Sequence, residues 1–413
     1  MQYRFPVHAE LCILFLCGFR GEFVSRTGRS MSVKPPPIHE RVVLERKDLQ
    51  SLFDALHQRK YDLIGPVVHD GAIVYDEFSK VDELPAGRAD EQEAATYRLK
   101  KTDEPWLFRY TVGPHSWKKF LHPPQLRLWQ MHGTGRNLEI DAPVEKPRSL
   151  AFIGVRSCDL HAIAVLDKVC IGGPYVDPGY AARRASCFIV AVNCVKAGGT
   201  CFCASMNTGP KAEHGFDIAL TEIVESHRHY FVADIGTPKG AEVMASVRTS
   251  PATPKDIAAA DQLVADAAGK MGRALDTRGI KELLYQNIEH PRWDNVAGRC
   301  LACANCTMVC PTCFCNTIED TTNVSGNQAE RWRRWDSCFT LEFSYVYGGS
   351  VRSTTRSRYR QWLTHKLASW HDQFGSSGCV GCGRCITWCP VGIDITEEAR
   401  AIRAGSVGHV HKG

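Results

Sequence analysis

The sequence predicts an α/β or α+β domain over residues 31–290, followed by a mainly helical domain over residues 291–413 that is organised around cysteines. Two continuous apolar runs, Leu150 to Val155 and Cys187 to Val192, have the length and composition of buried strands. Helical spacing of apolar residues follows the first of them, in Leu160 to Val169. The third observation is a concentration of cysteines near the C-terminus, which predicts a metal-binding second domain.

The other elements of the first domain are predicted from shorter patterns. Its first helix covers Asp48 to Gln58, where apolar residues recur at helical spacing after an Asp cap. A hairpin follows, because Tyr61 to Val68 and Ala72 to Tyr75 alternate like strands around a His-Asp-Gly turn. Tyr230 to Ala233 is predicted as a short strand, and Pro254 to Lys270 as a helix.

Composition describes an ordinary folded protein. The 413 residues are 44% hydrophobic and 23% charged, which suffices for two or three domains with a real core. The chain has nineteen cysteines but does not resemble a small secreted protein held by disulfides. The cysteines therefore indicate a reducing compartment in which they bind metal. The net charge of +5 is modest and does not by itself imply a nucleic-acid partner.

Residues 1–30 are predicted to be an extension outside the fold. The apolar run Leu11 to Phe19 is far shorter than the roughly 20 residues that cross a membrane, so no membrane span is expected. Only Arg4 precedes the run and no small-x-small cleavage site follows it, which argues against a signal peptide. An upstream start codon is therefore favoured, with Met31 as the true beginning.

Two cysteine runs of the form C-x-x-C-x-x-C-x-x-x-C-P dominate the second domain. This is the bacterial ferredoxin pattern, in which three close thiolates hold one [4Fe-4S] cluster and the fourth, before proline, reaches the other cluster. The sequence thus predicts a ferredoxin-like domain that binds two [4Fe-4S] clusters. The ligands predicted for cluster 1 are Cys300, Cys303, Cys306 and Cys389. The ligands predicted for cluster 2 are Cys379, Cys382, Cys385 and Cys310.

Zinc is the main alternative for these runs, because C-x-x-C pairs also build zinc ribbons. A zinc site needs only two such pairs, however, and neither the third close cysteine nor the Cys-Pro ending serves a tetrahedral ion. Disulfides are disfavoured further, since C-x-x-C-x-x-C cannot be paired off without strain.

A candidate third site lies in the α/β domain. Each of the two buried strands is followed by a cysteine at the edge where α/β sheets place their ligands, and a glycine-hinged loop, Gly198 to Cys203, supplies two more. Four thiolates of that origin can surround one cubane; zinc and buried structural cysteines are the alternatives. The residues of this candidate site are Cys158, Cys194, Cys201 and Cys203.

The stretch between the two runs is predicted to hold inserted helices, and it contains three more thiols, Cys313, Cys315 and Cys338. These are either additional ligands or, as we favour, buried thiols that line a cluster pocket. Arginines and aromatic residues make the insert basic. A solvated face, or a docking surface for an acidic partner protein, is favoured over nucleic-acid binding.

No catalytic motif accompanies these ligands. The chain has no dinucleotide-binding fingerprint, no P-loop, no convincing nucleophile elbow and no H-E-x-x-H. We therefore expect one-electron transfer rather than catalysis by this chain alone. Two other hypotheses remain: a reductase with its own flavin or nucleotide site in the α/β domain, and a redox-responsive binding protein that uses the basic insert.

Several motifs carry a family resemblance. They are Gly154-Val-Arg-Ser-Cys158-Asp159, Thr200-Cys-Phe-Cys203, Cys310-Pro-Thr-Cys-Phe-Cys315, Trp335-Asp-Ser-Cys338 and Cys379-Val-Gly-Cys-Gly-Arg-Cys385. Over about residues 40–400 the chain resembles the A-type subunit of anaerobic sulfite reductase and the iron–sulfur beta subunit of sulfhydrogenase-type [NiFe] hydrogenases. The resemblance implies a cytoplasmic electron-transfer subunit. Its implied partners are a subunit that binds flavin and NAD(P), and a terminal hydrogenase or reductase subunit.

Overall fold

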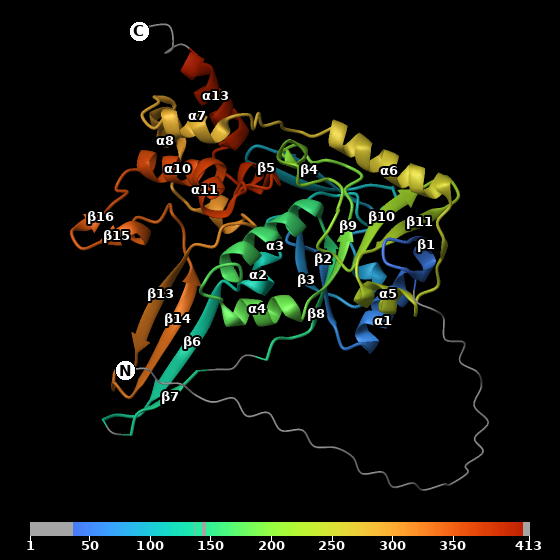
Figure 1. Cartoon of the computed structure of the whole chain (residues 1–413), viewed down its shortest axis with the longest axis horizontal. Helices are drawn as coiled ribbons and strands as arrows, with labels where there is room; N and C mark the ends of the chain where they lie inside the picture. The colour runs from blue at the N-terminus through green and yellow to red at the C-terminus, as the bar shows by residue number, and fades with distance from the viewer. Residues whose placement is uncertain (1–35, 136, 143–145, 408–413) are drawn as a thin grey trace, which may run out of the picture. The chain divides into compact units, whose positions relative to one another are not determined.

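The computed structural model describes residues 36–135, 137–142 and 146–407, which belong to one compact unit. The predicted extension of residues 1–30 and the start at Met31 lie outside the described residues. A large mixed sheet has helices on both faces, and a smaller sheet and a group of short helices extend from it (Figure 1). The architecture is thus a mixed α/β body with a C-terminal cysteine-bearing module.

The large sheet has eight strands in the order β12-β1-β11-β10-β9-β8-β2-β3. Strands β2, β8, β9 and β10 form a parallel centre, and the outer strands pair antiparallel. The strand bounds are β1 Arg41–Glu45, β2 Asp62–His69, β3 Ala72–Glu77, β8 Leu150–Val155, β9 Phe188–Val192, β10 Ile218–Val224, β11 His229–Ile235 and β12 Ser250–Pro251. The two buried strands and the hairpin expected from the sequence are confirmed as β8, β9 and β2–β3. Strand β1 precedes the first predicted element and pairs with β11.

Helices cover both faces of this sheet because its central strands have no polar face. On β9, Phe188 and Val190 pack into the core that includes α1 and α5, whereas Ile189 and Ala191 pack into the core that includes α3 and α4. A strand that is buried on both faces needs apolar residues at every position, hence the continuous apolar run. The helix bounds are α1 Leu49–Gln58, α3 Ser157–Cys170, α4 Pro178–Ala185, α5 Pro238–Met244 and α6 Pro254–Gly269.

The smaller sheet joins two parts of the chain that are far apart in sequence. Its four antiparallel strands have the order β13-β14-β6-β7, and Ala329 of β14 pairs with Met131 of β6. A hairpin thus replaces the first part of the insert, for which the sequence predicts helices. Gly326, at a φ of 69°, supplies the left-handed residue of its turn. The bounds are β6 Gln125–His132, β7 Glu139–Asp141, β13 Asn316–Thr322 and β14 Gln328–Trp335.

Short helices carry the two cysteine runs and pack around their own core, in which Trp293, Tyr359, Trp362 and Leu363 are buried. The segment after α10 is a π-helix, His365–Ser369, that leads into α11. The helix bounds are α7 Ile280–Gln286, α8 Arg292–Arg299, α9 Asn305–Met308, α10 Thr355–Thr364, α11 Trp370–Phe374, α12 Arg384–Thr387 and α13 Ile395–Val407. The module therefore combines helices with the β13–β14 hairpin, and the predicted boundary at residue 290 stays a prediction.

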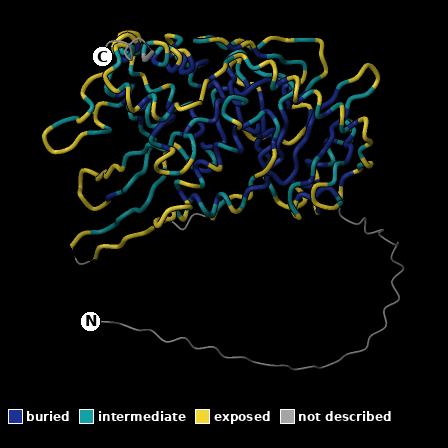
Figure 2. Tube along the Cα trace, turned by 45° about the horizontal axis from the view of Figure 1, so that its top comes forward, coloured by how far each residue is buried: buried dark blue, intermediate teal, exposed yellow. Residues whose placement is uncertain are grey.

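The remaining elements are short. They are β4 Arg88–Glu93, β5 Thr96–Lys101, β15 Tyr345–Val346, β16 Gly349–Ser350, α2 Lys118–Leu121 and the 3₁₀ turns Arg46–Asp48, Val81–Glu83, Cys203–Met206 and Glu342–Ser344. Burial is deepest along the strands of the large sheet, whereas the hairpin tips are exposed (Figure 2). In the part of the chain that the structure describes, no helix has the length and apolar character of a membrane span.

Candidate metal centres

One cavity in the described residues has a wall of apolar side chains and thiols. Phe339, Tyr359 and Trp362 provide much of its apolar surface. The cysteines that line it are Cys300, Cys303, Cys306, Cys385 and Cys389. The three close cysteines of the first run therefore meet the last cysteine of the second run, as the ferredoxin pattern requires for cluster 1.

A second cavity lies where the second run meets Phe202 from the α/β body, and Thr312 and Lys366 also line it. Its cysteines are Cys310, Cys379, Cys382 and Cys385. This is the set predicted for cluster 2, with the fourth cysteine supplied by the first run. The last cysteine of each run thus lies in the cavity that is lined by the three close cysteines of the other run.

Both runs have the same backbone conformation. Ala302 and Ala304 of the first run have φ values of 50° and 65°, and Gly381 and Gly383, at the equivalent positions, have values of 64° and 77°. Ala304 and Gly383 directly precede α9 and α12, each of which carries the third cysteine of its run. The left-handed residues turn the chain so that the three close thiols face one cavity.

The second run needs glycine at these positions because the α/β body packs against it. A Cβ on Gly381 would lie 2.7 Å from the carbonyl oxygen of Phe202, and a Cβ on Gly383 would lie 2.5 Å from that of Thr200. The alanines of the first run are only half-buried, and Cys303 between them is exposed. The first cavity therefore lies near the surface, and the second lies in the interior.

Backbone N–H groups point at several of these sulfurs. The pairs are Ala302 N–H to Cys300 Sγ at 3.4 Å, Gly381 N–H to Cys379 Sγ at 3.5 Å and Ile393 N–H to Cys389 Sγ at 3.3 Å. Such bonds stabilise thiolates and are one means by which proteins set the potential of an iron–sulfur cluster.

Burial raises the pKa of two of these thiols and so keeps them protonated in the absence of metal. It raises the pKa of Cys379 to about 12 and the pKa of Cys306 well above its ordinary value. A metal must therefore displace these protons when it binds. The four predicted ligands at each cavity, the N–H donors to sulfur and the apolar walls together fit a [4Fe-4S] cluster in each cavity.

The candidate third group lies on the sheet edge that the sequence indicates. Cys158 is in the first turn of α3 after β8, Cys194 follows β9, and Cys201 and Cys203 lie in the loop after it. The thiol of Cys203 interacts electrostatically with those of Cys201, Cys194 and Cys382, and Cys158 interacts with Cys203 and Cys382. The structure thus brings these thiols together beside the second cavity.

Close packing joins this group to the ligands predicted for cluster 2. The Sγ of Cys201 lies 3.8 Å from the carbonyl oxygen of Cys382. Cys158, Cys203 and Cys382 share one buried apolar cluster, against which Met271 packs. Among the described residues, no three His, Cys, Asp or Glu side chains are arranged to hold a single metal ion.

Two buried arginines accompany these thiols. Arg156 donates hydrogen bonds to the carbonyl oxygens of Phe108 and Tyr110, at 2.6 and 2.9 Å. It also interacts electrostatically with the thiols of Cys194 and Cys158. Arg384, between the second and third cysteines of the second run, pairs with Asp159 of α3. No sequence pattern predicts this pair, because it joins two segments that are far apart in the chain.

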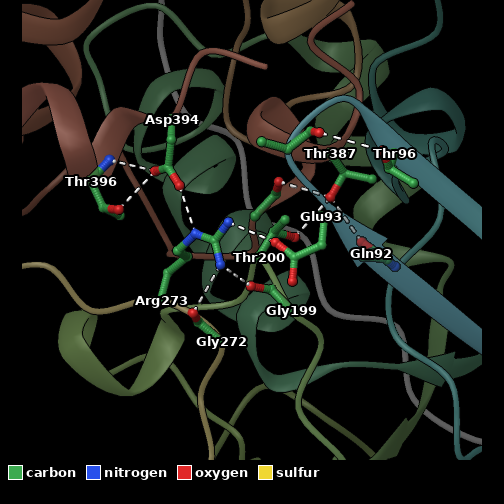
Figure 3. A network of polar contacts seen from close by, with 12 residues as sticks. Gln92, Glu93, Thr96, Gly199, Thr200, Gly272, Arg273, Thr387, Asp394 and Thr396 are labelled. Atoms are coloured by element: carbon green, nitrogen blue, oxygen red, sulfur yellow. Dashed lines mark hydrogen bonds and ion pairs between the residues drawn. The ribbon is translucent and has the colours of Figure 1, made fainter.

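A polar network also ties the loop of the third group to the module (Figure 3). Arg273 forms an ion pair with Asp394 at 2.7 Å and donates to the carbonyl oxygen of Gly199 at 2.8 Å. The hydroxyl groups of Thr200 and Thr387 are hydrogen-bonded at 2.8 Å. The loop that carries Cys201 and Cys203 is therefore held against α12 and the segment before α13.

Each of the three unassigned thiols is hydrogen-bonded to another cysteine. Cys313 is hydrogen-bonded to Cys310, and Cys315 is hydrogen-bonded to Cys338. The bond from the Cys338 thiol lowers the pKa of Cys315 to about 7. These pairs fit the interpretation that the thiols line a cluster pocket, and the roles of all three stay predictions.

Most of the arginines in the basic insert form ion pairs with carboxylates of the same chain, which offset their positive charge. Arg331 pairs with Asp320 at 2.6 Å, Arg334 pairs with Glu319 at 2.8 Å, and Arg360 with Glu289 at 2.9 Å. Further pairs join Arg333 to Asp177 and Arg356 to Glu289 and Asp294. Much of the positive charge seen in the sequence is therefore not free to attract a polyanion.

Comparisons with known proteins agree with this geometry. A family model described as a 4Fe-4S dicluster domain matches residues 299–393, which include both cysteine runs. The sulfhydrogenase 2 subunit beta of Pyrococcus furiosus is 30% identical to the chain over 346 residues, which cover 83% of this chain and 92% of that protein. No solved structure matches the chain. The chain belongs to the family of iron–sulfur beta subunits of sulfhydrogenases.

Proposed function

We propose that the chain is the iron–sulfur electron-transfer subunit of a sulfhydrogenase-like oxidoreductase complex. The pair of thiol-lined cavities carries the proposal, because each combines three cysteines of one run with the fourth cysteine of the other. Cluster 1 is assigned to Cys300, Cys303, Cys306 and Cys389. Cluster 2 is assigned to Cys379, Cys382, Cys385 and Cys310. Bound [4Fe-4S] clusters supply one-electron transfer, and the chain holds them, directs N–H groups at their ligands and excludes water.

The partners of this chain are the other subunits of the proposed oxidoreductase complex. Electrons pass, in the cytoplasm, from one partner to the other: one subunit binds flavin and NAD(P), and the other is a terminal hydrogenase or sulfur/sulfite reductase. The name of the relative, a subunit beta, supports a multisubunit assembly. Exposure of Cys303 and Leu301 beside the first cavity supports electron exchange with a partner at cluster 1.

Dependence on partners gives a direct test of this function. The purified chain is expected to be reduced by dithionite but only slowly, if at all, by NAD(P)H, because no nucleotide-binding motif is present in its sequence. The visible absorbance of the clusters, followed anaerobically after each reductant is added, measures the two rates. Rapid reduction by NAD(P)H without a partner would contradict the proposal and favour a nucleotide site in the α/β body.

A third [4Fe-4S] cluster, bound by Cys158, Cys194, Cys201 and Cys203, extends the proposal. Its support is the clustering of these thiols beside Cys382, with Arg156 as a buried counter-charge. The third cluster would then lie in the interior, next to cluster 2, and cluster 1 would lie near the surface. This order gives electrons a path between the interior and the exposed cluster.

Replacing Cys201 with alanine tests the third cluster. The variant is expected to lose about four irons per chain, because a cubane that lacks one thiolate ligand is not retained. Iron analysis and low-temperature EPR of the reduced full-length protein measure the loss. Cys187→Ala is the matched control, since Cys187 is equally buried but lies at the opposite end of β9. An unchanged iron content in Cys201→Ala would eliminate the third cluster and leave the two-cluster proposal intact.

A further inference from the structure

Two lysines are buried beside the second cavity. Lys366 is 5% exposed and Lys118 is 3% exposed. The ammonium group of Lys366 donates to the Sγ of Cys310 at 3.1 Å and to the hydroxyl of Thr312 at 3.2 Å. Lys118 donates to the carbonyl oxygen of Cys313 at 2.9 Å and lies 3.9 Å from the centre of the Trp335 ring.

These cations have no carboxylate partner among the described residues. A buried ammonium group is costly unless an anion offsets it, and the nearest groups that can become anionic are thiols. Cys310 is the thiol in direct contact with Lys366. A [4Fe-4S] cluster with four thiolate ligands has a net negative charge, which offsets the buried lysines.

The backbone around Lys366 is adapted to hold it there. Lys366 lies in the π-helix His365–Ser369, an uncommon conformation that often marks a functional position. Its carbonyl oxygen accepts hydrogen bonds from the N–H of Gly378 at 2.8 Å and the hydroxyl of Ser377 at 3.2 Å. Those two residues directly precede Cys379. Lys366 thus contacts Cys310 of the first run through its side chain, and its backbone bonds the two residues that precede the second run.

We propose that Lys366 is a positioning and charge-compensating residue for cluster 2. It holds Cys310 toward the second cavity, and its positive charge favours the reduced cluster, which carries one more negative charge than the oxidised cluster. One electron enters and no proton is transferred in this step. Lys366 therefore raises the reduction potential of cluster 2 relative to cluster 1. The inference rests on the proposed function, because it assumes that the cluster is bound.

Replacing Lys366 with methionine removes the charge and keeps the length of the side chain. At a fixed potential, the ratio of reduced to oxidised cluster 2 is expected to fall at least tenfold, which corresponds to about 59 mV for a one-electron couple. Lys366→Arg keeps the charge and is expected to stay close to the wild-type ratio. EPR-monitored redox titration and iron analysis of the full chain give both readouts. Lys168→Met is the matched control, because Lys168 is exposed and bonded to the nearby Ser376.

Each outcome supports or overturns the inference. The inference is supported if Lys366→Met keeps its full iron and its ratio of reduced to oxidised cluster 2 falls tenfold or more. It is also supported if Lys366→Met loses about four irons and Lys366→Arg does not. An unchanged titration with full iron overturns it, and so does equal iron loss in both variants, because charge would then not be the cause. If the wild-type chain itself binds no [4Fe-4S] clusters, the proposed function fails instead, so the two failures are distinguishable.

Discussion

Replacing Cys382 with serine is expected to remove about four irons and four sulfides per chain. Cys382 is buried in the second cavity, and a serine hydroxyl is a poor substitute for a thiolate ligand there. Because the two runs exchange their last cysteines, the variant should lose cluster 2 and keep the signals of cluster 1. Iron and acid-labile sulfide analysis of anaerobically purified protein, with EPR after reduction, measures the effect.

The matched control is Cys170→Ser, since Cys170 is buried at the end of α3, outside both cavities. Its iron content is expected to equal that of the unaltered chain. Zinc in place of iron, or full iron in Cys382→Ser, would contradict the assignment of both clusters. Loss of all iron would show instead that the two clusters assemble only together.

Removal of Arg384 is expected to destabilise the protein by about 3–5 kcal/mol. Arg384 and Asp159 are 0% and 1% exposed, and their atoms approach to 2.8 and 3.1 Å. Arg384→Met leaves the Asp159 carboxylate buried without its cation, and the Tyr75 hydroxyl at 3.4 Å is then its one remaining side-chain donor among the described residues. Anaerobic urea unfolding followed by fluorescence measures the change in the free energy of unfolding.

An exposed pair gives the control for this experiment. Arg278 is 90% exposed where it pairs with Asp276, so Arg278→Met is expected to change the free energy of unfolding far less than Arg384→Met does. The double variant Asp159→Leu with Arg384→Met removes both charges and should recover much of the lost stability. A cost for Arg384→Met as small as that for Arg278→Met would show that the buried pair does not hold the module to the α/β body.

Short-range patterns were enough to predict some of these features. Strands β8 and β9 follow from continuous apolar runs, since burial on both faces leaves no polar position within a strand. The two cysteine runs are equally local, because three ligands of a cubane come from one tight loop. Lys366, in contrast, has no recognisable sequence pattern. Its role depends on Cys310, which belongs to a separate segment of the chain.

The sequence by itself determined that the chain has buried strands followed by a helix in its first domain and two ferredoxin-type cysteine runs, because each of these is encoded by residues close together in the chain. Only the tertiary structure decided which residues that are far apart in the chain contact one another. It paired β14 with β6 where helices were expected, placed Arg384 against Asp159, and set the thiols of the α/β body beside Cys382. Such contacts depend on strand register, burial and charge pairing between distant segments, and no local periodicity records them.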